Sequence, residues 1–487
     1  MVLETVKFIK RVFGNPIVRA TVKYLSNKKV EDKSLLYHAL SIYSGEEAPR
    51  KFTPYLSSLL LSFIIDFSAH ILDVKSESTR KFFKERGVRR GIETILRSIG
   101  KYGITIPQML DAPFLVVWNF TNACNLKCKH CYQRAEKPLP NELSLEEKFK
   151  VLDQLEEAGV AAIAFSGGEP LIHQDFWPVV ERAVRKNFYV AVATNGTLIT
   201  ERVAEKLKTK GVNYVEISID SADPEKHDMF RGVKGSWRSA VRGIRNCVKR
   251  GLFTGIATTV TKYNYLEAKK IIGLARRLGV SRLIFFNFIP VGRGEKIVEM
   301  DLTPTEREVF LNMLYEELKV GDIEILSTAP QYARVVLEKS GGTMMSPTHF
   351  YAGPSISGLS DLANFIGGCG AGRIYCALQP DGTITPCVFI PQLPLGNIRE
   401  KSFSEIWENT PILKAFRSKD ILHANCGKCP YRYICGGCRA RALSYYGYIL
   451  APDPGCIRNI KYWRTMVKAK KPSKSSLKSK VKRYHAK

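Results

Sequence analysis

Residues 121–133 of the chain read TNACNLKCKHCYQ and directly follow the apolar run FLVVWNF at residues 114–120. Three cysteines, Cys124, Cys128 and Cys131, lie in this stretch at spacings of four and three residues. Three thiolates on one short loop leave one iron of a cubane iron–sulfur cluster without a protein ligand, so this iron is free to bind a small molecule. Taken alone, the triplet fits equally well a structural zinc site that borrows a fourth ligand such as His130.

The next apolar run carries a second motif that separates these two interpretations. Residues 161–170 read AAIAFSGGEP and end in Gly167, Gly168, Glu169 and Pro170. If the run is a strand of a βα unit, these residues lie at its carboxyl edge, where βα enzymes place their sites. Glycines allow a ligand close to the backbone, and a carboxylate accepts hydrogen bonds from an ammonium group. The pair of motifs therefore favours an open iron site over a zinc knuckle.

Short apolar runs alternate with amphipathic stretches along the middle of the chain. The runs cover residues 114–120, 161–166, 188–194, 212–220, 253–260 and 281–290. Helical patterns are found near residues 144–155, 175–187, 200–210, 236–250, 265–279 and 304–319. The first of these opens with Ser144 and Glu147, which form a capping box. Six strands alternating with helices predict parallel βα units, and hence a barrel or part of one.

CNLKCKHCY and FSGGEP resemble the two defining motifs of the radical S-adenosylmethionine (radical SAM) superfamily in type, order and spacing. The resemblance covers about residues 114–320 and implies an α/β fold, a partial (βα)6 barrel, with a [4Fe–4S] cluster held by Cys124, Cys128 and Cys131. It implies that the open iron chelates S-adenosylmethionine, and that one electron from a ferredoxin-like or flavodoxin-like donor cleaves this cofactor. The resulting 5′-deoxyadenosyl radical would take a hydrogen atom from an unactivated C–H bond.

The same resemblance implies further contacts to S-adenosylmethionine. The residues concerned are Tyr132, whose backbone would meet adenine; Gly167, Gly168, Glu169 and Pro170; Thr194 and Asn195 after the third strand; Ser218 and Asp220 near the ribose; and Arg231, which would pair with the methionine carboxylate. Strand ends and turns favour Asn, Ser and Asp for structural reasons as well.

A second set of cysteines lies in the last quarter of the chain. It consists of Cys369, Cys376, Cys387, Cys426, Cys429, Cys435, Cys438 and Cys456. Eight thiolates suffice for two fully ligated cubanes, and two zinc sites are the alternative. The arrangement resembles the SPASM extension of radical SAM enzymes, which implies about three [4Fe–4S] clusters in all. By this resemblance Cys369, Cys376, Cys387 and Cys438 hold the cluster nearer the barrel, and Cys426, Cys429, Cys435 and Cys456 hold the outer one.

Two residues separate Cys435 and Cys438, where many members of the SPASM group have three, which puts the division between the two clusters in question. The twelfth cysteine, Cys247, falls on an expected helix and is interpreted as a small core residue.

The substrate is open to several interpretations. Sulfatase maturases carry an aspartate after the cysteine that corresponds to Cys387, and Val388 at this position argues against that activity. The run CGGCRARA resembles enzymes that act on haem precursors and maturases of ribosomal peptides, with Arg439 and Arg441 as candidates to bind carboxylates. The basic, apolar first hundred residues favour a membrane lipid instead, and a helical cap on the barrel is the alternative for this region. An iron–sulfur scaffold or a nucleic-acid-binding protein has no need for the two motifs.

The composition indicates a cytoplasmic protein with several domains. The chain has 487 residues and a net charge of +28, and its twelve cysteines in CxxC-like clusters indicate metal binding in a reducing compartment rather than disulfides. Scarce Gln with abundant Lys, Arg and Glu suggests a thermophilic source. We expect a basic helical extension over 1–110, the barrel over 111–320, a linker or lid over 321–368, an auxiliary-cluster domain over 369–460 and a disordered basic tail over 461–487.

The expected partners follow from charge and hydropathy. The apolar stretch at residues 55–72 contains Asp66 and His70, so we interpret it as a buried helix rather than a membrane span. Peripheral attachment to a membrane surface is expected if the N-terminal region binds lipid. The barrel has no aromatic and basic motif typical of nucleic-acid binding, so no specific nucleic acid is expected.

Overall fold

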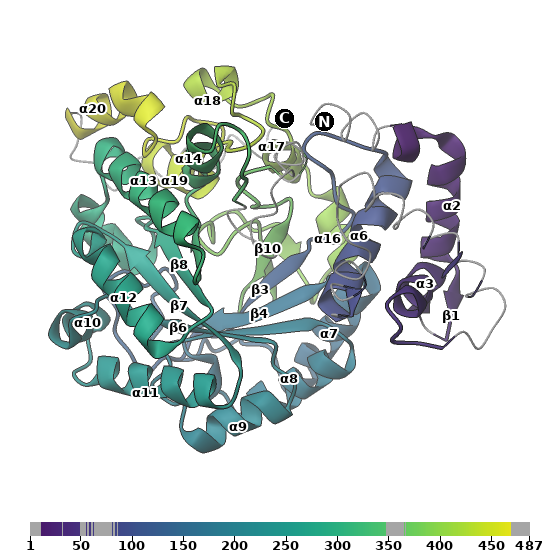
Figure 1. Ribbon diagram of the computed structural model, residues 1–487, viewed down its shortest axis with the longest axis horizontal. Helices are drawn as coiled ribbons and strands as arrows, with labels where there is room; N and C mark the ends of the chain where they lie inside the picture. The colour runs from purple at the N-terminus through teal and green to yellow at the C-terminus, as the bar shows by residue number, and fades with distance from the viewer. Residues whose placement is uncertain are drawn as a thin grey trace.

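The structure is a computed structural model that describes residues 11–31, 33–48, 86–346 and 367–468, together with residues 55, 58, 59, 62, 80, 83, 84 and 365. A ten-stranded sheet curves through its centre, with helices around the outer side (Figure 1). The C-terminal segments close one end of the curved sheet, and the N-terminal helices lie to one side of it (Figure 1).

Six parallel strands form the middle of the sheet, and all six correspond to runs expected from the sequence. They are β3 (Leu115–Thr121), β4 (Ala162–Gly167), β5 (Tyr189–Thr194), β6 (Tyr214–Ser218), β7 (Phe253–Val260) and β8 (Arg282–Asn287). Each pairs in parallel with the next along the chain. All six carboxyl ends therefore meet at one edge of the sheet, which confirms the partial barrel.

Helices connect these strands and cover their outer face. They are α7 (Leu145–Ala158), α8 (Phe176–Arg185), α9 (Glu201–Thr209), α10 (Pro224–Arg231), α11 (Ser236–Lys249), α12 (Ala268–Leu278) and α13 (Pro304–Val320). The expected capping box at the start of α7 is present, because Ser144 and Glu147 bond each other's backbone N–H groups. A second capping box, from Thr303 and Glu306, begins α13.

The two faces of the sheet differ in burial. Alternate residues such as Val190 and Val192 on β5 are fully buried in the core beneath the helices. The residues between them, Ala191 and Ala193, are only half-buried and face the interior of the barrel. The inward-facing side of the sheet is therefore partly accessible to solvent, whereas the layer between sheet and helices is closed.

The sheet extends beyond the six expected strands at both edges. We expected a linker or lid over residues 321–368, but β9 (Glu324–Ser327), which pairs in parallel with β8, and α14 (Gln331–Lys339) occupy its first part. At the other edge β10 (Tyr375–Leu378) pairs in parallel with β3, and β11 (Thr383–Thr385) and β12 (Gly396–Asn397) follow as antiparallel strands. The cysteine-rich region is thus built onto the barrel sheet itself.

Short helices make up the rest of the cysteine-rich region. They are α16 (Phe403–Asn409), α17 (Leu413–Arg417), α18 (Ala424–Lys428), α19 (Arg439–Tyr446) and α20 (Ile460–Lys468). Helix α20 covers the first residues of the expected basic tail, so the expectation of disorder now concerns only residues 469–487, which lie outside the described residues.

In its described residues the N-terminal region is mainly helical and packs against the barrel. It contains α2 (Pro16–Asn27), a short hairpin of β1 (Lys29–Val30) and β2 (Lys33–Ser34), α3 (Leu35–Tyr43) and α6 (Arg86–Tyr102). On α6, Arg90 donates to the carbonyl of Lys186 at 2.6 Å and Thr94 to that of Gly159 at 2.7 Å. These carbonyls lie at the ends of α8 and α7, where cations are favoured by the helix dipole. Helix α6 therefore caps two barrel helices.

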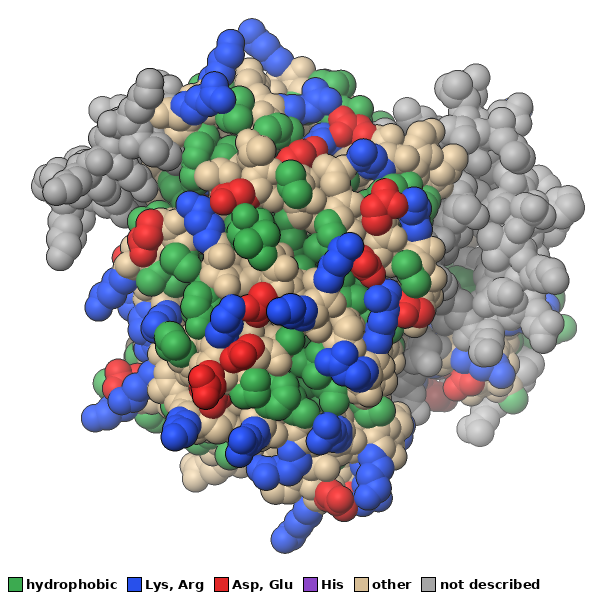
Figure 2. Space-filling view, turned by 60° about the vertical axis from the view of Figure 1, so that its left-hand side comes forward, with side chains coloured by type: hydrophobic (Ala, Val, Ile, Leu, Met, Phe, Trp, Pro, Cys, Tyr) green, Lys and Arg blue, Asp and Glu red, His purple; other side chains and the backbone are tan. Residues whose placement is uncertain are grey.

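The expected membrane contacts of this region are only partly covered by the structure. Of the three apolar residues expected to insert into a membrane, Leu3 and Ile9 lie outside the described residues, whereas Phe13 packs against the N-terminal core. Most of residues 55–72, the expected buried helix, also lie outside the described residues. In the described part of the chain, no helix is long and apolar enough to cross a membrane. On the face shown in Figure 2, Lys and Arg side chains are spread among acidic and apolar ones rather than gathered into one patch.

Candidate active site

The three cysteines of the CNLKCKHCY stretch lie on the loop that follows β3. Burial, with smaller contributions from Glu169, Cys128 and Cys131, raises the pKa of Cys124 to about 12, so the three thiols lie within electrostatic range of each other. The backbone N–H of Leu126 donates to Cys124 Sγ at 3.4 Å. Such N–H···S bonds stabilise thiolates and tune iron–sulfur clusters. These residues suit a [4Fe–4S] cluster with three protein ligands.

A segment after β8, which the sequence analysis did not single out, holds this loop in place. Arg293 donates from its backbone N–H to the Cys131 carbonyl at 2.9 Å and from Nε to the Cys128 carbonyl at 2.9 Å. At Gly292, with φ of +61°, a Cβ atom would lie 2.3 Å from the Tyr132 carbonyl oxygen. The only local signal was the pair of glycines in VGRG, which by itself indicates no more than a turn.

The GGEP motif lies against the same loop. A Cβ atom at Gly168 would lie 2.0 Å from the carbonyl oxygen of Ala123, and one at Gly167 would lie 2.7 Å from that of Thr121. Both glycines are therefore required by the close approach of β4 to the cluster loop. Pro170 begins a short 3-10 helix directly after the motif.

Glu169 is fully buried at this edge and is surrounded by hydrogen-bond donors. Its carboxylate accepts from Thr194 Oγ1 at 2.8 Å, from the Asn195 N–H at 2.8 Å and from the Leu171 N–H at 3.2 Å. Burial raises its pKa to about 7, although these donors oppose the shift. A carboxylate can accept about four hydrogen bonds, so one position remains for a donor such as the ammonium group of a ligand.

Asp220 and Arg231, both expected to contact S-adenosylmethionine, pair with each other in the structure. Arg231 Nε donates to Asp220 Oδ2 at 2.6 Å, and its Nη1 donates to Cys128 Sγ at 3.8 Å. Asp220 is fully buried and also accepts from the Thr259 N–H at 2.8 Å. Both Asp220 oxygens are thus engaged within the protein, and the expected contacts of Asp220 to the ribose and of Arg231 to the methionine carboxylate stay predictions. The guanidinium in turn places a positive charge beside a cluster thiol.

The remaining expected contacts lie at the same edge of the barrel. The Tyr132 hydroxyl donates to Asn119 Oδ1 at 3.0 Å, so the tyrosine side chain points into the barrel. Asn195 Nδ2 donates to Asn125 Oδ1 of the cluster loop at 2.7 Å. Ser218 ends β6 and is half-buried. His130, the alternative zinc ligand, stacks on Phe230 with ring centroids 4.5 Å apart.

Comparison with known proteins agrees with this geometry. The sequence pattern of the radical SAM superfamily matches residues 118–275, and that of an iron–sulfur cluster-binding domain, SPASM, matches residues 369–430. A protein of Methanosarcina barkeri named AdoMet-dependent heme synthase is 35% identical over 354 residues, which cover 72% of this chain and 97% of that relative. The chain belongs to the radical SAM superfamily. It is an enzyme that uses S-adenosylmethionine and [4Fe–4S] clusters.

Other radical SAM proteins share the same sequence or fold features. A mycofactocin maturase of Mycobacterium ulcerans is 32% identical over 355 residues, covering 72% of this chain and 89% of the relative. The crystal structure of Streptococcus suis SuiB bound to S-adenosylmethionine has a TM-score of 0.61 at 16% identity and covers 88% of this chain and 94% of SuiB. The SuiB comparison supports the fold alone.

In the SPASM region of this radical SAM enzyme, three cysteines surround one cavity. Cys369, Cys387 and Cys438 all line it, together with Tyr375. Backbone N–H groups of Phe389 and Arg441 donate to the sulfurs of Cys387 and Cys438, each at 3.4 Å. The buried Lys419 lies nearby, and Cys369 and Cys435 act on it electrostatically. Donors and a buried cation around sulfur atoms suit an anionic cluster.

A second group of cysteines lies near α18, which carries Cys426. Cys426 accepts from the Asp453 N–H at 3.4 Å and from Asn459 Nδ2 at 3.5 Å. Cys435 accepts from the Gly437 N–H at 3.4 Å, and Cys456 and Cys426 both raise its pKa. Cys429 belongs to the same segment and is half-buried. These four fit the outer cluster that the resemblance implied.

Cys376 does not join the inner group. It is fully buried in the core beneath the barrel helices, where Trp118 and Trp407 also lie. Beyond its burial, the group that perturbs its pKa is Arg417, and no cysteine contributes. The resemblance assigned Cys376 to the inner cluster, and the structure places it on the opposite side of β10. Cys247 lies on α11 in the core, as expected.

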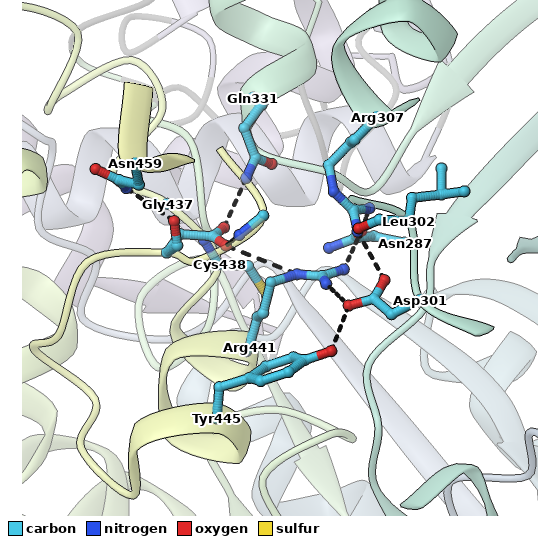
Figure 3. A network of polar contacts seen from close by, with 12 residues as sticks. Asn287, Asp301, Leu302, Arg307, Gln331, Gly437, Cys438, Arg441, Tyr445 and Asn459 are labelled. Carbon is cyan, nitrogen blue, oxygen red and sulfur yellow. Dashed lines mark hydrogen bonds and ion pairs between the residues drawn. The ribbon is translucent and has the colours of Figure 1, made fainter. Parts of the chain in front are cut away.

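A buried polar network joins the SPASM region to the barrel (Figure 3). Arg441 on α19 donates to Asp301, to Asn287 Oδ1 at 2.6 Å and to the Phe288 carbonyl at 2.6 Å. Arg307 on α13 also reaches Asp301, at 2.7 Å. We considered Arg439 and Arg441 as carboxylate-binding residues, but both are buried and bonded within the protein. Arg441 instead fixes the position of the SPASM region.

Proposed function

We propose that this radical SAM enzyme acts on a haem precursor, by removing a carboxyl group from a propionate side chain of an iron porphyrin. The observation that carries the proposal is the sequence relationship to the haem synthase of Methanosarcina barkeri, which extends over 97% of that protein. A second relative from the same organism, named Fe-coproporphyrin III synthase, is 32% identical and is covered over 89% of its length. A match over almost a whole enzyme includes the substrate-binding parts as well as the cofactor site.

The interior of the barrel supports a bulky, mostly apolar substrate. Its half-buried wall is formed largely by small or apolar side chains, namely Val117, Ala164, Ala191, Ala193, Ala257 and Ile284. Small side chains on inward-facing positions leave room inside a barrel. Near the inner cysteines, Tyr132 and Phe389 meet edge-to-face with ring centroids 5.1 Å apart. Aromatic and aliphatic surfaces of this kind suit a flat macrocycle.

The reaction would divide the work between the cofactors and the chain. Bound S-adenosylmethionine and its cluster supply a radical that removes one hydrogen atom from the propionate carbon β to the carboxyl group. Loss of carbon dioxide and of one electron, to a one-electron acceptor outside the chain, then leaves a vinyl group. Glu169 would hold the ammonium group of the cofactor, and Gly167 and Gly168 allow the close approach of β4.

Val388 is compatible with this reaction. The residue after Cys387 is apolar, so no side-chain carboxylate is placed there to take a proton. Decarboxylation needs no such base, because one electron of the broken C–C bond pairs with the radical electron to form the new double bond, and the other leaves with the acceptor. Peptide maturation is the second candidate, favoured by the 32% identity to mycofactocin maturase. The comparisons give no support to the lipid substrate that the N-terminal region had suggested.

Mass spectrometry of anaerobic reactions would test this proposal. The reconstituted and reduced full chain is incubated with S-adenosylmethionine and iron-coproporphyrin III, and the porphyrin is analysed for loss of carboxyl groups. We expect decarboxylated porphyrin and an equivalent amount of 5′-deoxyadenosine. Cofactor cleavage with unchanged porphyrin would contradict the proposal and return the choice to a peptide substrate. The variant Glu169→Gln serves as a control that should reduce both products together.

A further inference from the structure

Strand β10 places two neighbouring residues on opposite sides of the sheet. Tyr375 points into the cavity lined by Cys369, Cys387 and Cys438, and its hydroxyl donates to Cys387 Sγ at 2.6 Å. Cys376, the next residue, is on the other side and packs in the core of the barrel. Successive side chains of a strand point in opposite directions. The parallel pairing of Cys376 with Val116 of β3, itself a buried core residue, fixes this register.

The surroundings of Cys376 resemble those of a core cysteine. Several of the other cysteines in the C-terminal region accept a hydrogen bond from a backbone N–H, as Cys387, Cys435 and Cys438 do. Within the described residues, Cys376 accepts no hydrogen bond. Cys247 on α11, which no cluster requires, is equally buried. The inner group therefore has three cysteines, although four were implied.

An amide group faces the same cavity from the barrel side. Asn287, at the end of β8, lines the cavity and is 5% exposed. Its Oδ1 accepts from both Arg307 and Arg441, which fixes which end of the amide carries the nitrogen (Figure 3). In the described part of the chain Asn287 Nδ2 has no hydrogen-bond partner. A buried amide nitrogen without an acceptor is destabilising, so a ligand atom that accepts its hydrogen bond is favoured at this position.

We propose that the inner auxiliary cluster of this enzyme has only the three cysteines of the cavity as protein thiolate ligands, and that its fourth iron takes an exchangeable ligand that accepts a hydrogen bond from Asn287. The ligand is a small oxygen, nitrogen or sulfur donor with a negative or partly negative atom. Tyr375 has a separate role as a hydrogen-bond donor to Cys387. The proposal rests on the presence of the auxiliary cluster and is independent of the substrate.

Iron content and the electron paramagnetic resonance (EPR) spectrum of the full chain test the first part. Unaltered protein should hold about 12 irons in three cubanes. Cys376→Ala and the matched control Cys247→Ala should both keep this iron content and the spectrum of the inner cluster, whereas Cys387→Ala should lose about four irons. Loss of iron or an altered spectrum in Cys376→Ala alone would overturn the proposal. Cys376→Ser preserves the side-chain volume and should also leave the spectrum unchanged. If residue 376 were a ligand, its serine oxygen would shift the spectrum of the inner cluster.

Carbon-13-labelled cyanide tests the exchangeable position. The full chain with Cys124, Cys128 and Cys131 replaced by Ala carries only the auxiliary clusters, so cyanide cannot bind the first open iron. After reduction we expect a ¹³C coupling to a cluster in electron–nuclear double resonance. Absence of the coupling would overturn the proposal. Asn287→Asp in the same background keeps an oxygen toward the two arginines and removes the amide donor. It should weaken cyanide binding at least about tenfold at unchanged iron content, and equal affinity would show that Asn287 has no part in the site.

Discussion

Replacing Arg441 by methionine should loosen the SPASM region from the barrel. Arg441 is fully buried, and its guanidinium bonds Asp301, Asn287 and the Phe288 carbonyl across the junction. Methionine has a similar length and no charge. The variant leaves the Phe288 carbonyl without this donor, which costs about 1–3 kcal/mol if it stays buried. Asp301 keeps Arg307 and the Tyr445 hydroxyl but loses one of two guanidinium partners. Breaking a buried ion pair costs about 3–5 kcal/mol, and we expect the free energy of unfolding to fall by this amount.

The matched control is Arg399→Met. Arg399 also crosses from the SPASM region to the barrel, where its Nε and Nη2 bond the two oxygens of Glu147 on α7 at 2.6 and 2.9 Å. This pair is about one-third exposed, so its loss should cost no more than about 1 kcal/mol. The two variants thus remove the same type of side chain from the same junction and differ in burial.

Urea unfolding of the anaerobically reconstituted protein measures the difference in stability between the two variants. Tryptophan fluorescence and the absorbance of the clusters serve as the two probes of unfolding. The urea midpoint of Arg441→Met should fall well below that of Arg399→Met, and the auxiliary clusters should be lost before the first cluster. Equal midpoints for the two variants would refute the reasoning, because they would show that the buried network does not hold the SPASM region in place.

Three further predictions concern the cofactor site and the end of the chain. Because burial raises the pKa of Glu169 to about 7, the carboxyl is protonated below this pH and cannot pair with an ammonium group. S-adenosylmethionine affinity should therefore fall up to about tenfold per pH unit below 7. An affinity that does not change with pH in unaltered protein would contradict this. The same pH dependence in Glu169→Gln as in unaltered protein would contradict it as well. Gly168→Ala should displace the cluster loop and abolish cofactor cleavage, since its Cβ would lie 2.0 Å from the Ala123 carbonyl oxygen, whereas Gly273→Ala, where no atom lies closer than 3.5 Å, should be harmless. Truncation after Lys468 should preserve iron content and cleavage, because the removed residues are basic and polar; a loss of clusters would show that the tail belongs to the fold.

Features that depend on local sequence could be predicted well. The six central strands, the capping box at Ser144 and the position of GGEP at the end of β4 were expected from short-range patterns, and the structure has them. Each depends on the alternation of apolar residues or on contacts a few residues apart. The two cofactor motifs were recognisable because their chemistry requires fixed residues at fixed spacing.

Features that depend on long-range pairing could not be predicted. The side of β10 on which Cys376 lies is fixed by its pairing with β3, more than 250 residues earlier in the chain. A cysteine count cannot reveal this register, because a shift of one residue would exchange Cys376 with Tyr375. Arg441 looked like a substrate-binding residue because its partner Asp301 lies 140 residues away.

Transfer of deuterium from substrate to cofactor tests the central claim most directly. Iron-coproporphyrin III labelled with deuterium at the propionate carbons β to the carboxyl groups is incubated with the reduced full chain and unlabelled S-adenosylmethionine. We predict that the 5′-deoxyadenosine formed carries one deuterium atom and that the porphyrin loses a carboxyl group in equal amount. Unlabelled 5′-deoxyadenosine together with intact porphyrin would contradict the account.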